Sequence, residues 1–289
     1  MSDKAIITCA LTGVLTNPSV YNVPVTPEEM ADAAEQAWNE GAVIVHCHFR
    51  DQREGMGHLP TWDVDVVGSI IAAIKERTPD MIINMSTGIG GPDISGPVAC
   101  LEAHEPDLAA CNAGTLNYLK LKSDGTWAWP PHIFDNPVEK VQKFLDVMKA
   151  HNVIPEFECF DTGIVRSVAL YKKAGMFEGD PHISLVMGVA SGQAAKASWL
   201  PLLKEEMLPG THWQVIGVGR SEVWDLHRGA LELGGDVRTG LEDTFYLPNG
   251  EKARNNGDLV KALAALAREV GREPATAAEA RQILGIRKK

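Results

Sequence analysis

Residues 42–50 form an apolar run that ends in two histidines and an arginine, His46-Cys47-His48-Phe49-Arg50. Side chains two apart on a strand point to the same face, so His46 and His48 project together. Two imidazoles at the end of a buried strand suit a divalent metal, and imidazole is a good ligand for zinc. The alternative is that both rings hydrogen-bond to neighbouring carboxylates, because a metal site needs a third ligand from elsewhere in the chain.

Eight strand-like segments alternate with helix-like segments along the chain. The predicted strands cover residues 5–11, 42–50, 81–85, 108–111, 154–160, 182–186, 213–217 and 236–240. The predicted helices cover residues 26–40, 64–77, 95–104, 137–150, 163–174, 194–206, 222–233 and 256–271, and a helical tail follows. This alternation predicts an α/β fold with a parallel sheet. Eight units in 289 residues without a linker predict a single (β/α)8 TIM barrel over residues 1–289, with an open doubly wound sheet as the alternative.

Polar residues gather where the predicted strands end, which is where barrel enzymes place their active sites. These residues are His46, His48 and Arg50, then Ser86, Asn112, Glu156 and Glu158, and finally Arg238, Glu242 and Asp243. The last strand of a closed barrel neighbours the first, and the His46 strand comes next. Glu242 is therefore the best-placed third metal ligand, and two histidines with one carboxylate leave coordination positions open for substrate.

Asp243 and Arg238 extend this predicted site. A carboxylate beside a metal and a substrate is a natural general base, which indicates a catalytic role for Asp243. Arg238 could hold a substrate carboxylate or fix the orientation of Asp243, while the structural alternative is a surface ion pair. After the seventh strand, Gly219 and Arg220 open a helix and could bind the phosphates of a cofactor, although such a turn also forms for packing reasons alone.

Composition excludes several classes of function. The net charge of -11 and the pI of about 5.3 argue against nucleic acid as a partner. Five cysteines without a CxxC pair predict a reducing compartment and no disulfide framework. Four of them lie in or beside apolar strand-like runs, where we expect buried thiols: Cys9, Cys47, Cys111 and Cys159. No signal peptide or membrane-spanning segment is predicted, so we expect a cytoplasmic protein.

Several of these motifs together resemble a known family. The matching segments are Thr12-Gly13, residues 24–29, His46-x-His48-x-Arg50, Ser86-Thr87-Gly88, residues 112–117, residues 238–243 and the tail at 274–281. In this order they resemble the β-keto acid cleavage enzymes, which include the 3-keto-5-aminohexanoate cleavage enzyme. The resemblance covers nearly the whole chain and implies a zinc-dependent (β/α)8 barrel that forms a homo-oligomer, a dimer or a tetramer.

The resemblance also implies a reaction, in which a β-keto acid and acetyl-CoA give acetoacetate and a new acyl-CoA. By position, zinc would be bound by His46, His48 and Glu242. Ser86 and Asn112 would contact the substrate, and Asp243 would be the base, assisted by Arg238. Zinc would act as a Lewis acid on the substrate oxygens, and the resulting enolate would attack the acetyl thioester.

Two positions depart from the family pattern. Members that act on amine-bearing substrates carry a glutamate where this chain has Leu15, and a hydroxyl residue often stands where it has Ala110. A buried ammonium without a partner is unfavourable, so we expect a substrate without an amine. An apolar β-keto acid of short or medium chain fits best, and an anionic one held by Arg50 is the alternative.

Other functions on the same barrel remain open from the residues alone. One is a metal-dependent hydrolase, although such barrels usually carry His-x-His on the first strand. Another is a zinc lyase or aldolase, which would share the enolate chemistry without CoA. A third is a non-catalytic barrel that binds zinc or a small ligand. Turnover that depends on CoA would discriminate among them.

Overall fold

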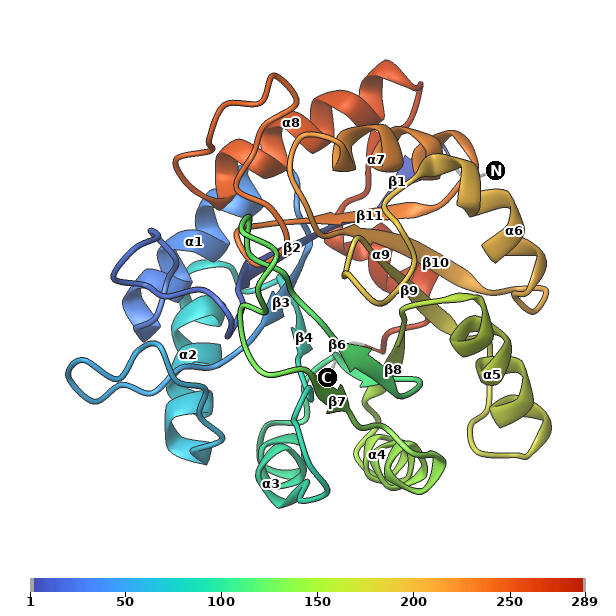
Figure 1. Cartoon of the computed structure of the whole chain (residues 1–289), viewed down its shortest axis with the longest axis horizontal. Coiled ribbons are helices and arrows are strands. Elements are labelled where there is room, and N and C mark those ends of the chain that lie inside the picture. The colour runs from blue at the N-terminus through green and yellow to red at the C-terminus, as the bar shows by residue number, and fades with distance from the viewer. Residues whose placement is uncertain (1–2, 288–289) are drawn as a thin grey trace.

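The computed structural model describes residues 3–287, and among them eight parallel strands form a closed barrel (Figure 1). Around the barrel the strands follow the order β10-β11-β2-β3-β4-β5-β8-β9. Their bounds are β2 Ile7–Thr12, β3 Ile44–Cys47, β4 Ile82–Met85, β5 Leu108–Asn112, β8 Ile154–Cys159, β9 His182–Met187, β10 His212–Gly217 and β11 Asp236–Thr239. The barrel prediction is confirmed, and the closure of β11 onto β2 excludes an open sheet.

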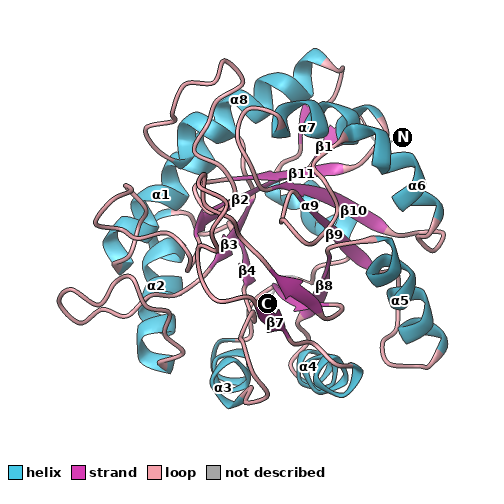
Figure 2. Ribbon diagram, viewed as in Figure 1, coloured by secondary structure: helices cyan, strands magenta, loops and turns pink. Residues whose placement is uncertain are grey.

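Helices form a ring outside the strands (Figure 2). They are α1 Pro27–Glu40, α2 Val64–Arg77, α3 Ser95–His104, α4 Val138–Ala150, α5 Thr162–Lys173, α6 Leu200–Glu205, α7 Val223–Glu232 and α8 Asn256–Glu269. Helix α1 begins with a capping box between Thr26 and Glu29 and ends at Gly41 in the left-handed region, as its sequence predicts. The predicted helix over 194–206 is shorter, since the 3-10 helix Ala197–Trp199 precedes α6.

The chain's final helix, α9 (Ala277–Leu284), covers the amino end of the barrel. Its Ala280, with Ile286 just beyond, packs against Ile44 and Ile82 of the strands. The short strands β1 (Lys4–Ala5) and β12 (Glu273–Pro274) pair in parallel just before α9. With the amino end closed, the carboxyl ends of the strands are the place for a site.

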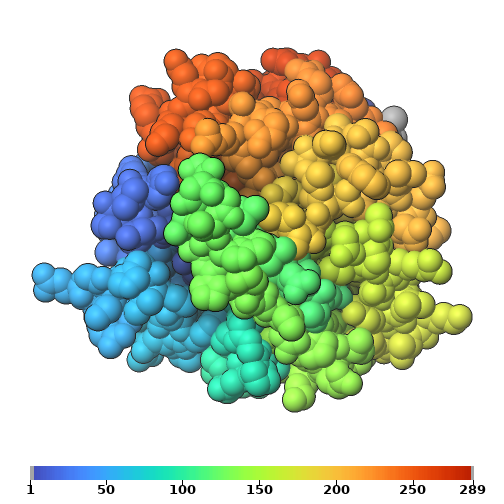
Figure 3. Space-filling view, in the orientation of Figure 1, coloured from blue at the N-terminus to red at the C-terminus, as the bar shows by residue number. Residues whose placement is uncertain are grey.

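A long connecting segment, residues 113–137, joins β5 to α4, and we call it the excursion. The sequence predicts only a loop here, but β6 (Leu116–Tyr118) and β7 (His132–Phe134) pair antiparallel within it. Three-residue strands are too short for a periodic pattern to reveal them. On the face shown in Figure 3, this green segment covers the centre of the molecule, in front of the barrel strands of Figure 1.

Two further predictions can be compared with the structure. All five cysteines are buried free thiols, which confirms the expectation for Cys9, Cys47, Cys111 and Cys159 and adds Cys100. Within residues 3–287, no helix combines the length and apolar character needed to cross a bilayer.

Candidate active site at the carboxyl end of the barrel

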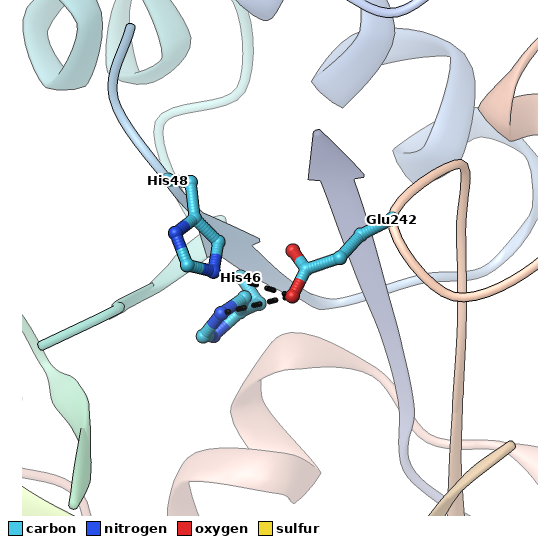
Figure 4. A group of neighbouring side chains, drawn as sticks. All are labelled: His46, His48 and Glu242. Carbon is cyan, nitrogen blue, oxygen red and sulfur yellow. Dashed lines mark ion pairs between the residues drawn. The ribbon is translucent and has the colours of Figure 1, made fainter. Parts of the chain in front are cut away.

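His46, His48 and Glu242 converge at the carboxyl end of the barrel, and their side chains point toward one another (Figure 4). The Nε2 atoms of His46 and His48 lie 3.8 and 3.2 Å from Oε1 of Glu242. One ligand atom from each residue lies within 4.8 Å of the others. Two imidazoles and a carboxylate at this separation could hold a divalent cation, as the sequence predicts.

Glu242 reaches the histidines because the chain turns sharply after β11. Gly240 has φ of 148°, and a Cβ at this position would lie 2.1 Å from the carbonyl oxygen of Ala10. Only glycine tolerates that approach, and the turn brings Glu242 back over β2. Within residues 3–287, the buried Oε2 atom of Glu242 has no hydrogen-bond partner. This leaves a carboxylate oxygen available as a ligand.

Charges around Glu242 keep it ionised. Burial alone would raise its pKa, but electrostatic interactions with His48 and Arg238 outweigh burial and hold the pKa below its ordinary value. The ring of His46 behaves in the opposite way. Burial, together with the charge of Arg238, lowers the pKa of His46 well below its usual value. An ionised carboxylate and a neutral imidazole are the forms that bind a metal.

Arg238 holds the catalytic carboxylate that the sequence predicts. Its Nε and Nη2 atoms donate to the two carboxylate oxygens of Asp243, at 3.0 and 2.9 Å. Nη2 also donates to Glu242 at 2.8 Å, and Nη1 donates to Glu158 at 3.4 Å. The guanidinium is only 2% exposed. Of its two predicted roles, this geometry supports fixing the orientation of Asp243, because each nitrogen already has a carboxylate partner.

Asp243 is poised to exchange a proton near neutral pH. Burial raises its pKa to about 7, the Glu242 charge acts in the same direction, and Arg238 opposes both. Burial likewise raises the pKa of Glu158 to about 7, again against the effect of Arg238. A carboxyl with such a pKa is well matched to general acid–base chemistry.

A buried polar cluster inside the barrel supports His46. Asn84 lies opposite His46 on β4 and donates to Glu156 at 2.8 Å. Gln214 donates to the same carboxylate oxygen at 3.1 Å and to the Ser184 hydroxyl at 2.9 Å. In the described chain, Nδ1 of His46 and Oδ1 of Asn84 have no hydrogen-bond partner, and they are a complementary donor and acceptor on facing residues. A hydrogen bond between them would direct Nε2 of His46 toward Glu242.

Ser86 and Asn112 lie together on the neighbouring side of the site. A Cβ placed on Gly88 would lie 3.6 Å from the Ser86 hydroxyl and 3.7 Å from the Asn112 amide nitrogen. Both side chains are buried, and the Oδ1 atom of Asn112 has no hydrogen-bond partner among the described residues. The structure therefore brings together the two predicted substrate contacts and leaves an amide oxygen there without a protein partner.

The sequence also predicts substrate contacts for Leu15 and Arg50, but the structure does not place these side chains together with Ser86 and Asn112. Leu15 is 63% exposed. Arg50 is buried and donates to Thr12 and to the carbonyl oxygens of Gly13 and Gly57. Its guanidinium thereby joins the loops that follow β2 and β3. Substrate contacts by these two residues stay predictions, and the partners of Arg50 do not favour one.

Gly219 and Arg220, predicted to bind the cofactor, form the turn before α7. The amide of Gly219 donates to the carbonyl of Asp243 at 3.3 Å, and the amide of Arg220 donates to the Glu222 carboxylate at 3.1 Å. The Arg220 guanidinium is exposed and lies 5.2 Å from the centre of the Tyr246 ring. A CoA contact at this turn stays a prediction. The Glu222 side chain already accepts a hydrogen bond from the Arg220 amide, which a phosphate would need.

Sequence reasoning missed two kinds of residue near the site. Asn84 could have been found, because it is a polar residue in an apolar strand, two positions before Ser86 and therefore on the same face. Tyr118 and Phe134 gave no comparable signal. They flank a long segment whose apolar residues show no regular spacing, and only the pairing of β6 with β7 brings them together.

Comparisons with known proteins agree with this geometry. The family model for the beta-keto acid cleavage enzymes matches residues 4–286. The chain is 36% identical to a 3-keto-5-aminohexanoate cleavage enzyme of Fusobacterium nucleatum, over 100% of both chains. It is 31% identical to a 3-oxoadipate:acetyl-CoA acetyltransferase of Cupriavidus necator, over 99% of this chain and 96% of that protein.

One solved structure supports the fold. The apo structure of ObcA superposes with a TM-score of 0.76 and 21% sequence identity, over 91% of this chain. This chain spans 65% of that protein's length. At this identity the likeness concerns the barrel architecture.

Proposed function

This chain belongs to the beta-keto acid cleavage enzymes, and on that premise we propose that it is a zinc-dependent, acyl-CoA-forming transferase that cleaves a C–C bond. It would convert a β-keto acid and acetyl-CoA into acetoacetate and a new acyl-CoA. One observation carries the proposal. The His46–His48–Glu242 set stands beside a carboxylate, Asp243, that Arg238 holds in place with two hydrogen bonds.

The donor set fits zinc. Two imidazole nitrogens and one carboxylate oxygen make up a catalytic zinc site, and the fourth position remains for substrate. The buried Oε2 atom of Glu242, which has no partner within the described residues, is consistent with a role as a metal ligand. When bound, zinc would supply Lewis acidity to the keto and carboxylate oxygens of the substrate, which makes the C2 protons more acidic.

Asp243 would remove one C2 proton from the β-keto acid. The resulting carbanion attacks the carbonyl carbon of acetyl-CoA, and the CoA thiolate leaves. The thiolate then adds to the former keto carbon, and the bond between C2 and C3 breaks. Asp243 returns its proton to C2, which completes acetoacetate, while the remainder leaves as the new acyl-CoA. Arg238 orients Asp243 for both proton transfers.

Ser86 and Asn112 would bind the substrate's polar end. Their side chains converge around Gly88, and both can donate hydrogen bonds to a carboxylate or keto oxygen. Leu15 stands where an amine-binding family member has a glutamate, which favours a substrate without an amine. We further expect a cytoplasmic homo-oligomer, a dimer or a tetramer.

The first experiment is mass spectrometry of acyl-CoA products. The purified protein is incubated with acetyl-CoA and a mixture of β-keto acids, with and without a chelator, and zinc is then added back. We expect acetoacetate and a new acyl-CoA that vanish with the chelator and return with zinc. A zinc-loaded protein that forms no acyl-CoA from any acid would contradict the proposal. Products released without CoA would favour the hydrolase or aldolase alternatives.

A further inference from the structure

Three aromatic side chains form a continuous surface at the barrel mouth, which we name the aromatic wall: Tyr118 on β6, Phe134 on β7, and Phe160 just after β8. The ring centres of Tyr118 and Phe134 are 6.2 Å apart, and those of Phe134 and Phe160 are 6.1 Å apart. Both pairs meet edge to face, which is a favourable arrangement of aromatic rings.

The aromatic wall borders the residues that are proposed to bind substrate. A Cβ placed on Gly88 would lie within 3.9 Å of the Phe134 ring, the Ser86 hydroxyl and the Asn112 amide. The Phe134 end of the wall therefore lies beside Ser86 and Asn112.

The hydroxyl of Tyr118 is not used in the fold. The residue is partly buried, and within the described chain its hydroxyl makes no hydrogen bond and is not enclosed by the fold. A phenol can both donate and accept a hydrogen bond, so this accessible hydroxyl is available to a molecule bound at the barrel mouth.

Contacts behind the aromatic wall keep it in position. Trp129 stacks on Tyr118 at 6.0 Å, and the ring of His132 lies 5.5 Å from the same tyrosine. Lys140 donates to the carbonyl oxygens of Ile89, Gly91 and Asp135 at 2.8–3.0 Å. These bonds tie the end of the excursion to the loop after β4. The wall is thus held in place before substrate binds, which favours its use as a binding surface.

We propose that the aromatic wall binds the side chain of the β-keto acid, the group transferred to CoA, and that it selects apolar alkyl or aryl side chains. This inference rests on the proposed function. With the keto acid's polar end among the metal ligands, Ser86 and Asn112, its side chain extends along the adjacent ring surface. Aromatic rings reward apolar contact. A carboxylate lying on them would lose water without gaining an ionic partner, and an ammonium would exchange its hydration for cation–π attraction alone.

The test compares kcat/KM for β-keto acids whose side chains end in an alkyl, phenyl, ammonium or carboxylate group. We expect the wild type to prefer the alkyl and phenyl acids. Phe134→Ala and Tyr118→Ala should lower kcat/KM for these two acids by about tenfold or more, mainly through KM, because each removes ring surface. Tyr118→Phe keeps the ring and should keep the preference.

Trp127→Ala is the matched control. Trp127 lies on the same excursion but is 48% exposed and outside the aromatic wall, so its variant should retain the wild-type values. Zinc content and thermal unfolding show whether each variant is intact. If Phe134→Ala does not fold, Phe134→Leu replaces it. This variant should lower kcat/KM for phenyl acids more than for alkyl acids.

The results separate this inference from the proposed function. A zinc-loaded wild type that forms no acyl-CoA contradicts the function itself. If the wild type is active but prefers ammonium or carboxylate side chains, the aromatic wall does not select apolar groups. Equal kcat/KM for wild type, Tyr118→Ala and Phe134→Ala across the panel would overturn the inference while the function stands.

Discussion

Gly13 lies directly against the side chain of Glu242, and a Cβ added at Gly13 would fall 2.9 Å from Cγ of that glutamate. Carbon atoms do not approach so closely, so Gly13→Ala must displace the carboxylate from the two histidines. We predict a zinc affinity at least about tenfold weaker, as expected when a metal ligand is misplaced. Competition with a chromophoric chelator measures it.

Gly90→Ala is the control for this experiment, because nothing lies within 4 Å of the Cβ it would add. The prediction is wrong if Gly13→Ala and Gly90→Ala bind zinc equally well.

Asp243→Asn should remove the general base while keeping the geometry. An amide cannot accept the C2 proton, so we expect kcat to fall by about 10²–10⁴-fold, the usual contribution of a positioned base. Steady-state kinetics gives the loss, and elemental analysis should show unchanged zinc content, since Asp243 is not among the proposed ligands. Asp225→Asn, at an exposed position of α7, serves as the control. A normal turnover number for Asp243→Asn would refute the assigned role.

Asn84→Leu tests the support of His46 from inside the barrel. The substitution keeps approximate volume but leaves Nδ1 of His46 without its complementary acceptor. We predict about 10–100-fold weaker zinc binding, the size found when the outer partner of a ligating histidine is lost. Chelator competition again provides the measurement.

Ser184→Ala is the comparison, because Ser184 belongs to the same buried cluster but contacts Gln214 rather than Asn84. Wild-type zinc affinity in Asn84→Leu would show that the amide does not position His46.

His227 should make stability depend on pH. Its ring is fully buried in α7, and neither ring nitrogen has a hydrogen-bond partner among the residues the structure describes. Burial lowers its pKa to about 4. The unfolded chain takes up a proton near pH 6.5 but the folded chain does not, so the contribution to stability is complete above that pH. It is lost as the pH falls from about 6.5 toward 4.

Urea unfolding at pH 7 and pH 5 measures this effect. We expect the His227 contribution to fall by about 2 kcal/mol over that range, and His227→Leu to reduce the pH dependence by the same amount. An unchanged slope in His227→Leu would mean that the ring is already protonated, or is hydrated, in the folded protein.

The sequence by itself predicted the barrel and the meeting of His46, His48 and Glu242. Eight alternating segments imply a closed parallel sheet, and closure places the end of the last strand beside the first two. The spacing of His46 and His48 then suffices, because a strand directs alternate side chains to one face. Their meeting with Glu242 follows from strand order, which local patterns reveal, and from the turn at Gly240.

Only the tertiary structure decided how the remaining groups are used. Arg238 could have bound substrate, but the folded chain surrounds it with Asp243, Glu242 and Glu158 and so commits its nitrogens to orientation. The Arg50 guanidinium likewise donates its hydrogen bonds to Thr12, Gly13 and Gly57 of the neighbouring chain segments. Tyr118 reaches the site through an excursion that has no periodic pattern. These outcomes depend on strand register and loop paths, which arise from contacts between residues far apart in sequence, and no local spacing encodes them.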